Sequence, residues 1–218
     1  MFYLEKCPLC KHSDCYAYHQ GSKPERDYFH CPNCDLVFVP VRFHLCSKEE
    51  QRIYDQHNNL PSDPNYRGFL NKLCQPLSKL LPKGAKGLDF GSGPGPTLSL
   101  MLEENGFSCV NYDKYYANDP DVLTQDFDFV STTEVVEHLS NPGEIFELLF
   151  KLVHKRAGVL GLMTKQHSQD PVHFANWHYK NDPTHISFYS QSTLIYLSQR
   201  YQKHLDIIGD DVAIFTPH

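Results

Sequence analysis

The stretch Leu88-Asp89-Phe90-Gly91-Ser92-Gly93-Pro94-Gly95 decides the fold of this chain. Its apolar start belongs to a strand predicted over 87–90, and a helix is predicted over 97–105, with Gly106 stopping it. Glycines directly after a strand leave the backbone open to a ligand, because they carry no Cβ. The N-terminus of the following helix favours negative charge, such as a carboxylate. The stretch therefore predicts a strand, a ligand-binding turn and a helix in succession.

Outward from this turn, short apolar runs alternate with helical patterns. Further strands are predicted over 108–113, 127–131 and 159–163, and a closing hairpin over 205–215. Asn141 is predicted to cap one helix, with Pro142 at its first position, and Ser190 to cap another. Strands that alternate with helices predict an α/β fold, with a largely parallel sheet, helices on both faces and ligands at the carboxyl ends of the strands.

Two kinds of cofactor suit such a turn. A dinucleotide requires G-x-G-x-x-G, in which the last glycine packs the helix against the strand, and here Pro96 takes that place. An acid followed by G-x-G-x-G is instead present as Asp89, Gly91, Gly93 and Gly95. These residues resemble the first motif of the class I S-adenosylmethionine-dependent methyltransferases. The resemblance implies a Rossmann-like methyltransferase sheet and S-adenosylmethionine as cofactor.

The resemblance also implies roles for particular residues. Gly91 and Gly93 would face the methionine part of the cofactor, and Asp113, which closes the next strand, would accept hydrogen bonds from the ribose. The segment from 115 to 125 is too short for the usual third strand and its helix, so Leu123 and Thr124 are the candidates on the adenine side. The predicted cofactor-binding set is Asp89, Gly91, Ser92, Gly93, Gly95, Tyr112, Asp113, Thr133 and Glu134.

The segment from Phe127 to Pro142 resembles the fourth motif of the ubiquinone-pathway O-methyltransferases. If it turns helically after the strand, Glu134, Glu137 and His138 share one face at i, i+3 and i+4. The set predicts a general base for a hydroxyl acceptor. Small-RNA 2′-O-methyltransferases are similar here and use such a set with Mg²⁺, for which His185 is the candidate fourth ligand. The alternative is a scaffold that caps the loop near the cofactor.

The loop from 165 to 189 is dense in imidazole and aromatic side chains. In a Rossmann-like enzyme, a loop at this position is expected to cover the methyl acceptor. The set predicts a polar, aromatic-lined acceptor pocket built from His167, His173, Trp177, His178, Tyr179, His185 and Tyr189.

Four of the eight cysteines form two CxxC pairs, Cys7 with Cys10 and Cys31 with Cys34. This spacing suits tetrahedral Zn²⁺ bound by four thiolates, and so small a segment would need the metal in order to fold. A redox CxxC is the alternative, but neither pair lies in a thioredoxin-like βαβ setting. The segment resembles the zinc modules of deoxysugar C-methyltransferases, which implies a structural or substrate-shaping role. The other four cysteines are predicted to be ordinary thiols: Cys15, Cys46, Cys74 and Cys109.

Changes in composition divide the chain into three parts. Residues 1–46 form the predicted zinc-ribbon-like module, 47–83 the linking helices, and 84–218 the cofactor-binding domain. Ser47 is predicted to cap the first linking helix, with Glu50 completing a capping box. Pro76 is predicted to kink or end the second linking helix.

The overall composition and charge limit the kinds of partner that this protein is expected to bind. A net charge of −6 and the lack of a lysine- or arginine-rich stretch argue against a nucleic-acid partner. There is no apolar run long enough to span a bilayer and no signal-like start, so the expected location is the cytoplasm. The predicted function is S-adenosylmethionine-dependent methylation of oxygen, nitrogen or carbon in a small-molecule acceptor. The alternatives are an RNA methyltransferase and a non-catalytic protein that binds the cofactor and uses zinc for a partner contact.

Overall fold

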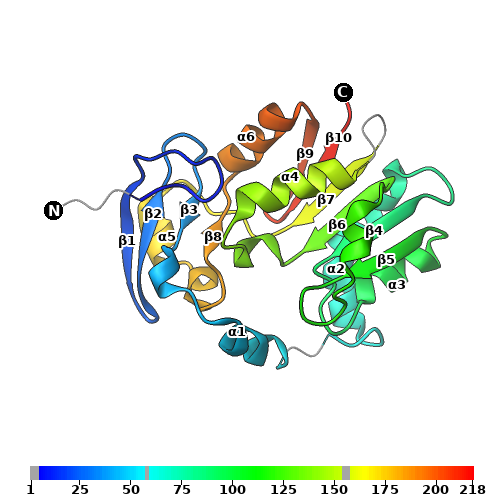
Figure 1. The fold of residues 1–218 in the computed structure, drawn as a ribbon, viewed down its shortest axis with the longest axis horizontal. Coiled ribbons are helices and arrows are strands. Elements are labelled where there is room, and N and C mark those ends of the chain that lie inside the picture. The colour runs from blue at the N-terminus through cyan, green and yellow to red at the C-terminus, as the bar shows by residue number, and fades with distance from the viewer. Residues whose placement is uncertain (1–4, 57–58, 154–157) are drawn as a thin grey trace.

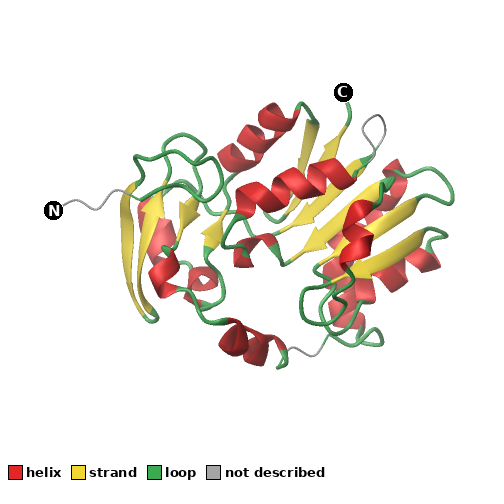
Figure 2. Ribbon diagram, viewed as in Figure 1, coloured by secondary structure: helices red, strands yellow, loops and turns green. Residues whose placement is uncertain are grey.

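The computed structural model describes residues 5–56, 59–153 and 158–218. These residues form a six-stranded sheet and a smaller four-stranded sheet. Figure 1 shows the large sheet with its helices on one side of the molecule and the small sheet, near the N-terminus, on the other. Figure 2 shows that helices cover both faces of the large sheet, as the sequence predicts.

The large sheet carries the predicted α/β order. Its strands lie in the order β5 (Ser108–Tyr112), β4 (Lys86–Phe90), β6 (Phe129–Thr133), β7 (Val159–Met163), β10 (Val212–Thr216) and β9 (His204–Ile208). The first four are parallel, and β10 is antiparallel to both of its neighbours, which closes the sheet with the predicted hairpin. The Rossmann-like fold class is therefore confirmed.

Two apolar layers hold the helices on the sheet. On one face, α2 (Pro64–Leu80) and α3 (Thr97–Glu104) pack over a core that includes Leu73, Leu102 and Phe129. On the other, α4 (Pro142–Leu152) and α6 (Gln191–Tyr201) cover a core that includes Phe146 and Leu194. Strands buried on both faces explain the short continuous apolar runs of the sequence.

The small sheet joins segments far apart in the chain. Its order is β1 (Tyr16–Ser22), β2 (Glu25–His30), β3 (Val37–Phe38) and β8 (Ser187–Phe188), so its last strand comes from the loop predicted to cover the acceptor. That loop also holds α5 (Pro171–Asn176), whose Phe174 is fully buried with Tyr28 and Phe188. Much of the aromatic content of the loop therefore fastens it to the N-terminal segment. Of the seven residues predicted to build the acceptor pocket, His185 lines a cavity of about 600 Å³, and the other six lie outside that cavity.

Helix α1 (Ser47–Tyr54) connects the N-terminal segment with α2, and Figure 1 shows it between the two sheets. Its N-cap is Cys46, with Glu49 completing the capping box, so the predicted cap at Ser47 is wrong by one residue. Pro76 does not end α2, because Leu73 and Leu77 are buried on either side of it and hold the helix on the core. The described residues also form four short 3-10 helices: η1 (Val41–Phe43), η2 (Pro120–Thr124), η3 (Val136–His138) and η4 (His178–Asn181).

Among the described residues, no helix has both the length and the apolar character needed to cross a membrane.

Candidate functional site

A cavity of about 600 Å³ opens at the carboxyl ends of β4, β5 and β6. All nine predicted cofactor-binding residues line it, from Asp89 in β4 to Glu134 after β6. Leu123 and Thr124 do not line it, because η2 turns the Leu123 side chain against the apolar core and leaves Thr124 exposed. The sequence therefore located the glycine-turn side of the cavity, while its two adenine-side candidates lie elsewhere.

The glycine turn is held in shape by the last residue of β5. Gly91 N and Ser92 N donate to Tyr112 O at 2.7 and 3.2 Å. Gly91 and Gly93 have φ of +79° and +65°, a region that disfavours any residue with a Cβ. At Gly95 a Cβ would lie 2.2 Å from Asn59 O, so the backbone passes too close there for a side chain.

Asp113 ties the two sides of this cavity together. Its Oδ2 accepts from Gly93 N at 3.0 Å, and its Oδ1 accepts from the amides of Tyr115 and Tyr116 at 2.8 and 3.1 Å. Each carboxylate oxygen can accept further bonds, so hydroxyls of a ligand can still be bound. The Ser92 Oγ atom is buried, and none of the described residues gives it a hydrogen-bond partner. A polar ligand with hydroxyl groups fits both features.

Asp89 is the buried acid at the end of β4. It is 3% exposed and accepts from Ser131 Oγ at 2.9 Å. Burial raises the pKa of this carboxyl to about 7, and the single hydrogen bond from Ser131 only partly offsets that rise. The site therefore holds a carboxyl group that titrates near neutral pH.

The raised pKa of Asp89 predicts a pH-dependent stability. An unfolded Asp titrates near 3.8 and the folded group near 7, so its stabilising contribution is complete below pH 4 and is lost as the pH rises through 7. The Asp89→Asn variant cannot ionise, so at pH 8 it should be more stable than the wild type by about 4 kcal/mol. The difference should vanish near pH 4. Urea unfolding at both pH values measures it, with exposed Asp121→Asn as the control.

The acceptor side differs from its predicted geometry. Glu134 has φ of +52°, and only one 3-10 turn, η3, follows it, so Glu134, Glu137 and His138 do not share one helical face. Glu134 and His138 line the cavity, whereas Glu137 is fully buried outside it. Its carboxylate accepts from Thr164 Oγ1 at 3.0 Å and from Tyr179 Oη. The predicted helical turn does not form directly after β6, because Glu134, the next residue, is left-handed and its N donates to Met163 O at 2.8 Å.

The loop after η4 brings His185 beside His138. The two rings are 4.8 Å apart in a T-shaped contact. His138 Nδ1 lies 3.1 Å from Thr184 O and His185 Nδ1 lies 2.8 Å from Tyr179 O, and since a carbonyl can only accept, both Nδ1 atoms carry the proton. Burial, followed by the neighbouring His138, lowers the pKa of His185. A neutral imidazole whose Nε2 accepts a proton is suited to be a general base.

Burial shifts the pKa values of both glutamates upward. Burial, followed by the charge of Glu137, raises the pKa of Glu134 to about 9. Burial also raises the pKa of Glu137. One ligand atom each from Glu137, His138 and His185 lies within 4.8 Å of the others, so these three residues could hold a divalent ion. Glu134 is outside that group, which removes one of the four predicted ligands.

Sequence reasoning missed the wall contributed by α1. Glu50 and Tyr54 line the cavity opposite the sheet. Glu50 Oε2 accepts from Tyr115 Oη at 2.6 Å and from Lys114 Nζ at 2.7 Å, and Tyr116 Oη donates to Asp55 at 2.7 Å. None of the α1 side chains is buried, so polar contacts join this helix to the loop after β5. No local pattern signals such contacts, because the partners lie more than 60 residues apart.

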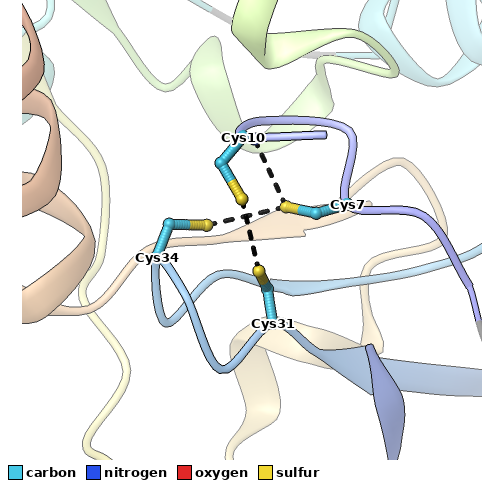
Figure 3. Close-up of side chains that lie close together, drawn as sticks. All are labelled: Cys7, Cys10, Cys31 and Cys34. Atoms are coloured by element: carbon cyan, nitrogen blue, oxygen red, sulfur yellow. Dashed lines mark hydrogen bonds between the residues drawn. The ribbon is translucent and has the colours of Figure 1, made fainter. Parts of the chain in front are cut away.

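The two CxxC pairs converge on one point. Figure 3 shows their four sulfur atoms pointing toward one another, with Cys7 Sγ 3.5 Å from Cys34 Sγ and Cys10 Sγ 3.4 Å from Cys31 Sγ. All four sulfurs lie within 4.8 Å of one another, and Cys10 N donates to Cys7 Sγ at 3.5 Å. Four facing thiols with an amide donor to sulfur fit a tetrahedral ion such as Zn²⁺.

Comparisons with known proteins agree with this geometry. A family model described as a methyltransferase domain matches residues 64–202. CalO1, a methyltransferase of calicheamicin biosynthesis in its S-adenosylhomocysteine-bound form, is 14% identical, with a TM-score of 0.51 over 79% of this chain and 59% of that chain. An O-methyltransferase family protein from Burkholderia thailandensis is 13% identical, with a TM-score of 0.51 over 82% of this chain and 64% of that chain. Both share the fold. No curated protein matches the sequence.

Proposed function

Since the chain belongs to the methyltransferase domain family and is an S-adenosylmethionine-dependent methyltransferase, we propose that it methylates a hydroxyl group of a small-molecule acceptor. The observation that carries this proposal is the His138–His185 pair, which lies in the same cavity as the glycine turn. When bound, S-adenosylmethionine supplies an activated methyl group. An acceptor hydroxyl must lose its proton, whereas an amine needs little help.

The cavity divides between cofactor and acceptor. We assign the methionine part to Gly91, Ser92 and Gly93, where the open space at Gly93 and the unpartnered Ser92 hydroxyl provide room and a polar partner. We assign the ribose to Asp113, and the sulfonium end to the region between Asp89 and His138. Catalysis then consists largely of positioning, because the methyl donor is already reactive.

His185 is the proposed base, and His138 orients the acceptor beside it. Asp182 Oδ2 lies 3.9 Å from His185 Nε2, and although burial opposes ionisation, its bonds from Thr184 and the nearby His185 lower the pKa of Asp182 overall. A charged carboxylate near the ring stabilises the imidazolium that forms when the hydroxyl proton is taken. An O-methyltransferase of the ubiquinone-pathway type is the subgroup that this arrangement favours.

The proposed base predicts a separation of binding from turnover. His185→Gln should lower kcat by about 100-fold or more, the scale of one general base, while S-adenosylhomocysteine binds within about twofold of wild type. His173→Gln, in the same loop but exposed, is the matched control. Methyl-labelled S-adenosylmethionine with phenols, catechols and primary amines measures turnover. Transfer to amines alone, undiminished in the variant, would contradict the proposal.

A divalent ion held by Glu137, His138 and His185 is the second candidate, favoured by the proximity of their ligand atoms. Such an ion would acidify the acceptor hydroxyl. Turnover that survives chelation at a concentration sparing zinc would exclude this metal-assisted form.

An RNA acceptor is the other alternative, and the net charge of −6 argues against it. Salt-dependent binding of a mixed RNA pool would support it.

For the N-terminal segment we propose structural Zn²⁺ at Cys7, Cys10, Cys31 and Cys34. The division into a zinc module (1–46), linking helices (47–83) and a methyltransferase domain (84–218) is proposed with one addition, because β8 of the third part completes the sheet of the first. The module thus lies where it can shape the acceptor side.

A further inference from the structure

One wall of the acceptor side of the cavity is a loop that is hydrogen-bonded to the N-terminal segment on its other side. This loop, residues 180–186, places Asp182 and His185 in the lining of the cavity. The carbonyl of Thr184 accepts a hydrogen bond from His138 Nδ1. Ile186 N donates to Glu137 O at 2.8 Å, and Ile186 O accepts from Val39 N at 2.9 Å. The loop therefore lies between the methyltransferase sheet and the small sheet.

One buried arginine donates hydrogen bonds to several carbonyls of this loop. Arg26 of β2 is 2% exposed, and its guanidinium donates to Pro183 O at 3.1 Å, to Asp182 O at 2.8 Å and to Lys180 O. Its Nε donates to Tyr28 Oη at 2.8 Å, and that hydroxyl in turn donates to Lys180 O at 2.9 Å. Three contacts of the guanidinium thus fix three loop carbonyls directly, and the fourth orients the Tyr28 hydroxyl, which donates to one of those carbonyls.

Burying the guanidinium of Arg26 has a large desolvation free energy, which argues against an incidental contact. A buried charge normally requires an opposite charge, and the ion pairs found among the described residues include none with Arg26. Lys180 is also buried, at 6% exposure, and burial followed by the charge of Arg26 lowers its pKa. The loop carbonyls therefore supply the polar partners that the buried guanidinium needs.

We infer that Arg26 is a positioning residue for the acceptor site, through which the cysteine-bearing segment sets the place of His185 and of the Thr184 carbonyl that orients His138. The inference rests on the proposed function for its catalytic meaning. Only arginine fits the position, because a lysine ammonium is a single point of donation and cannot span carbonyls of three different residues. The N-terminal segment thereby becomes part of the acceptor site without lining it.

The test compares two arginines of the same segment. Arg26→Lys keeps the charge and removes the planar fork, whereas Arg42→Lys changes an exposed arginine that pairs with Glu5 and Asp27. In the full-length protein, nitrogen NMR of the histidine rings reports the Nδ1-protonated tautomer of His185, assigned with His185→Gln. Hydrogen exchange of 178–186 reports how firmly the loop is held.

The expected results separate the loop from the cofactor half. In Arg26→Lys the His185 tautomer signal should become a mixture, and exchange of the loop amides should accelerate at least about tenfold. Turnover should show a lower kcat with the KM for S-adenosylmethionine unchanged. Binding of S-adenosylhomocysteine should stay within twofold of wild type, and Arg42→Lys should match wild type throughout.

Unchanged tautomer and exchange in Arg26→Lys would overturn the inference. If that variant does not fold, Tyr28→Phe removes one donor to Lys180 O while keeping the buried ring, and it should show the same changes to a smaller extent. Its identity with wild type would likewise count against the inference. Failure of the proposed function is distinguishable, because it would show in the wild-type protein itself as methyl transfer to amines alone, whatever the tautomer and exchange results of Arg26→Lys.

Discussion

Replacing Asp113 with alanine is expected to weaken S-adenosylhomocysteine binding by about 100-fold or more. Two hydroxyl bonds to a carboxylate contribute about 1.5 kcal/mol or more each, and about 3 kcal/mol corresponds to roughly this factor. The variant also loses the acceptor for Gly93 N, Tyr115 N and Tyr116 N, so the glycine turn and the loop after β5 separate. Calorimetric titration of the full-length protein measures the effect.

The control for this prediction is Asp119→Ala, an exposed acid six residues on whose carboxylate accepts only the local amide of Asp121 among the described contacts. It should bind S-adenosylhomocysteine as the wild type does, and neither protein should bind NADH. Asp113→Asn should fall between, because an amide oxygen can accept from one side but its nitrogen cannot accept from Gly93 N. Wild-type affinity in Asp113→Ala would mean that the cofactor lies elsewhere in the cavity.

Replacing Cys31 with serine is expected to remove the metal and unfold the N-terminal segment. Structural zinc sites of this type contribute about 10 to 16 kcal/mol of apparent binding free energy in zinc-finger peptides, more than so small a segment gains from its own core. Metal analysis should fall from about one zinc per chain to none. Gly143 N donates to Pro8 O at 3.3 Å, so the start of α4 should loosen together with the segment.

Cys46→Ser is the matched control, because Cys46 is exposed and lies outside the four-sulfur cluster. Its zinc content should equal that of the wild type, and its thermal midpoint should be equal or slightly higher, because serine is a preferred N-cap residue for α1. A chelator strong enough to strip zinc should reproduce the Cys31→Ser phenotype in the wild-type protein. If Cys31→Ser keeps its metal and its midpoint, the four cysteines do not form a structural site.

Local sequence patterns were enough to predict the fold and the glycine-turn side of the site. The turn from Asp89 to Gly95 requires positive φ at Gly91 and Gly93 and close approach of other atoms at Gly91 and Gly95, and adjacent glycines in the sequence meet both requirements. The CxxC spacing brings two sulfurs together within one turn, so the approach of four needed only a hairpin between the pairs. Alternation of apolar runs with helical patterns likewise determined the layered sheet.

Only the tertiary structure decided the acceptor side. Whether Glu137 faces the cavity depends on where β6 ends and on Thr164 and Tyr179, which surround its carboxylate. The wall formed by α1, the pairing of β3 with β8 and the bonds from Arg26 to residues more than 150 positions away have no local signature. Sequence periodicity records which face of an element is buried, whereas the partner across that face is selected by packing of the whole chain.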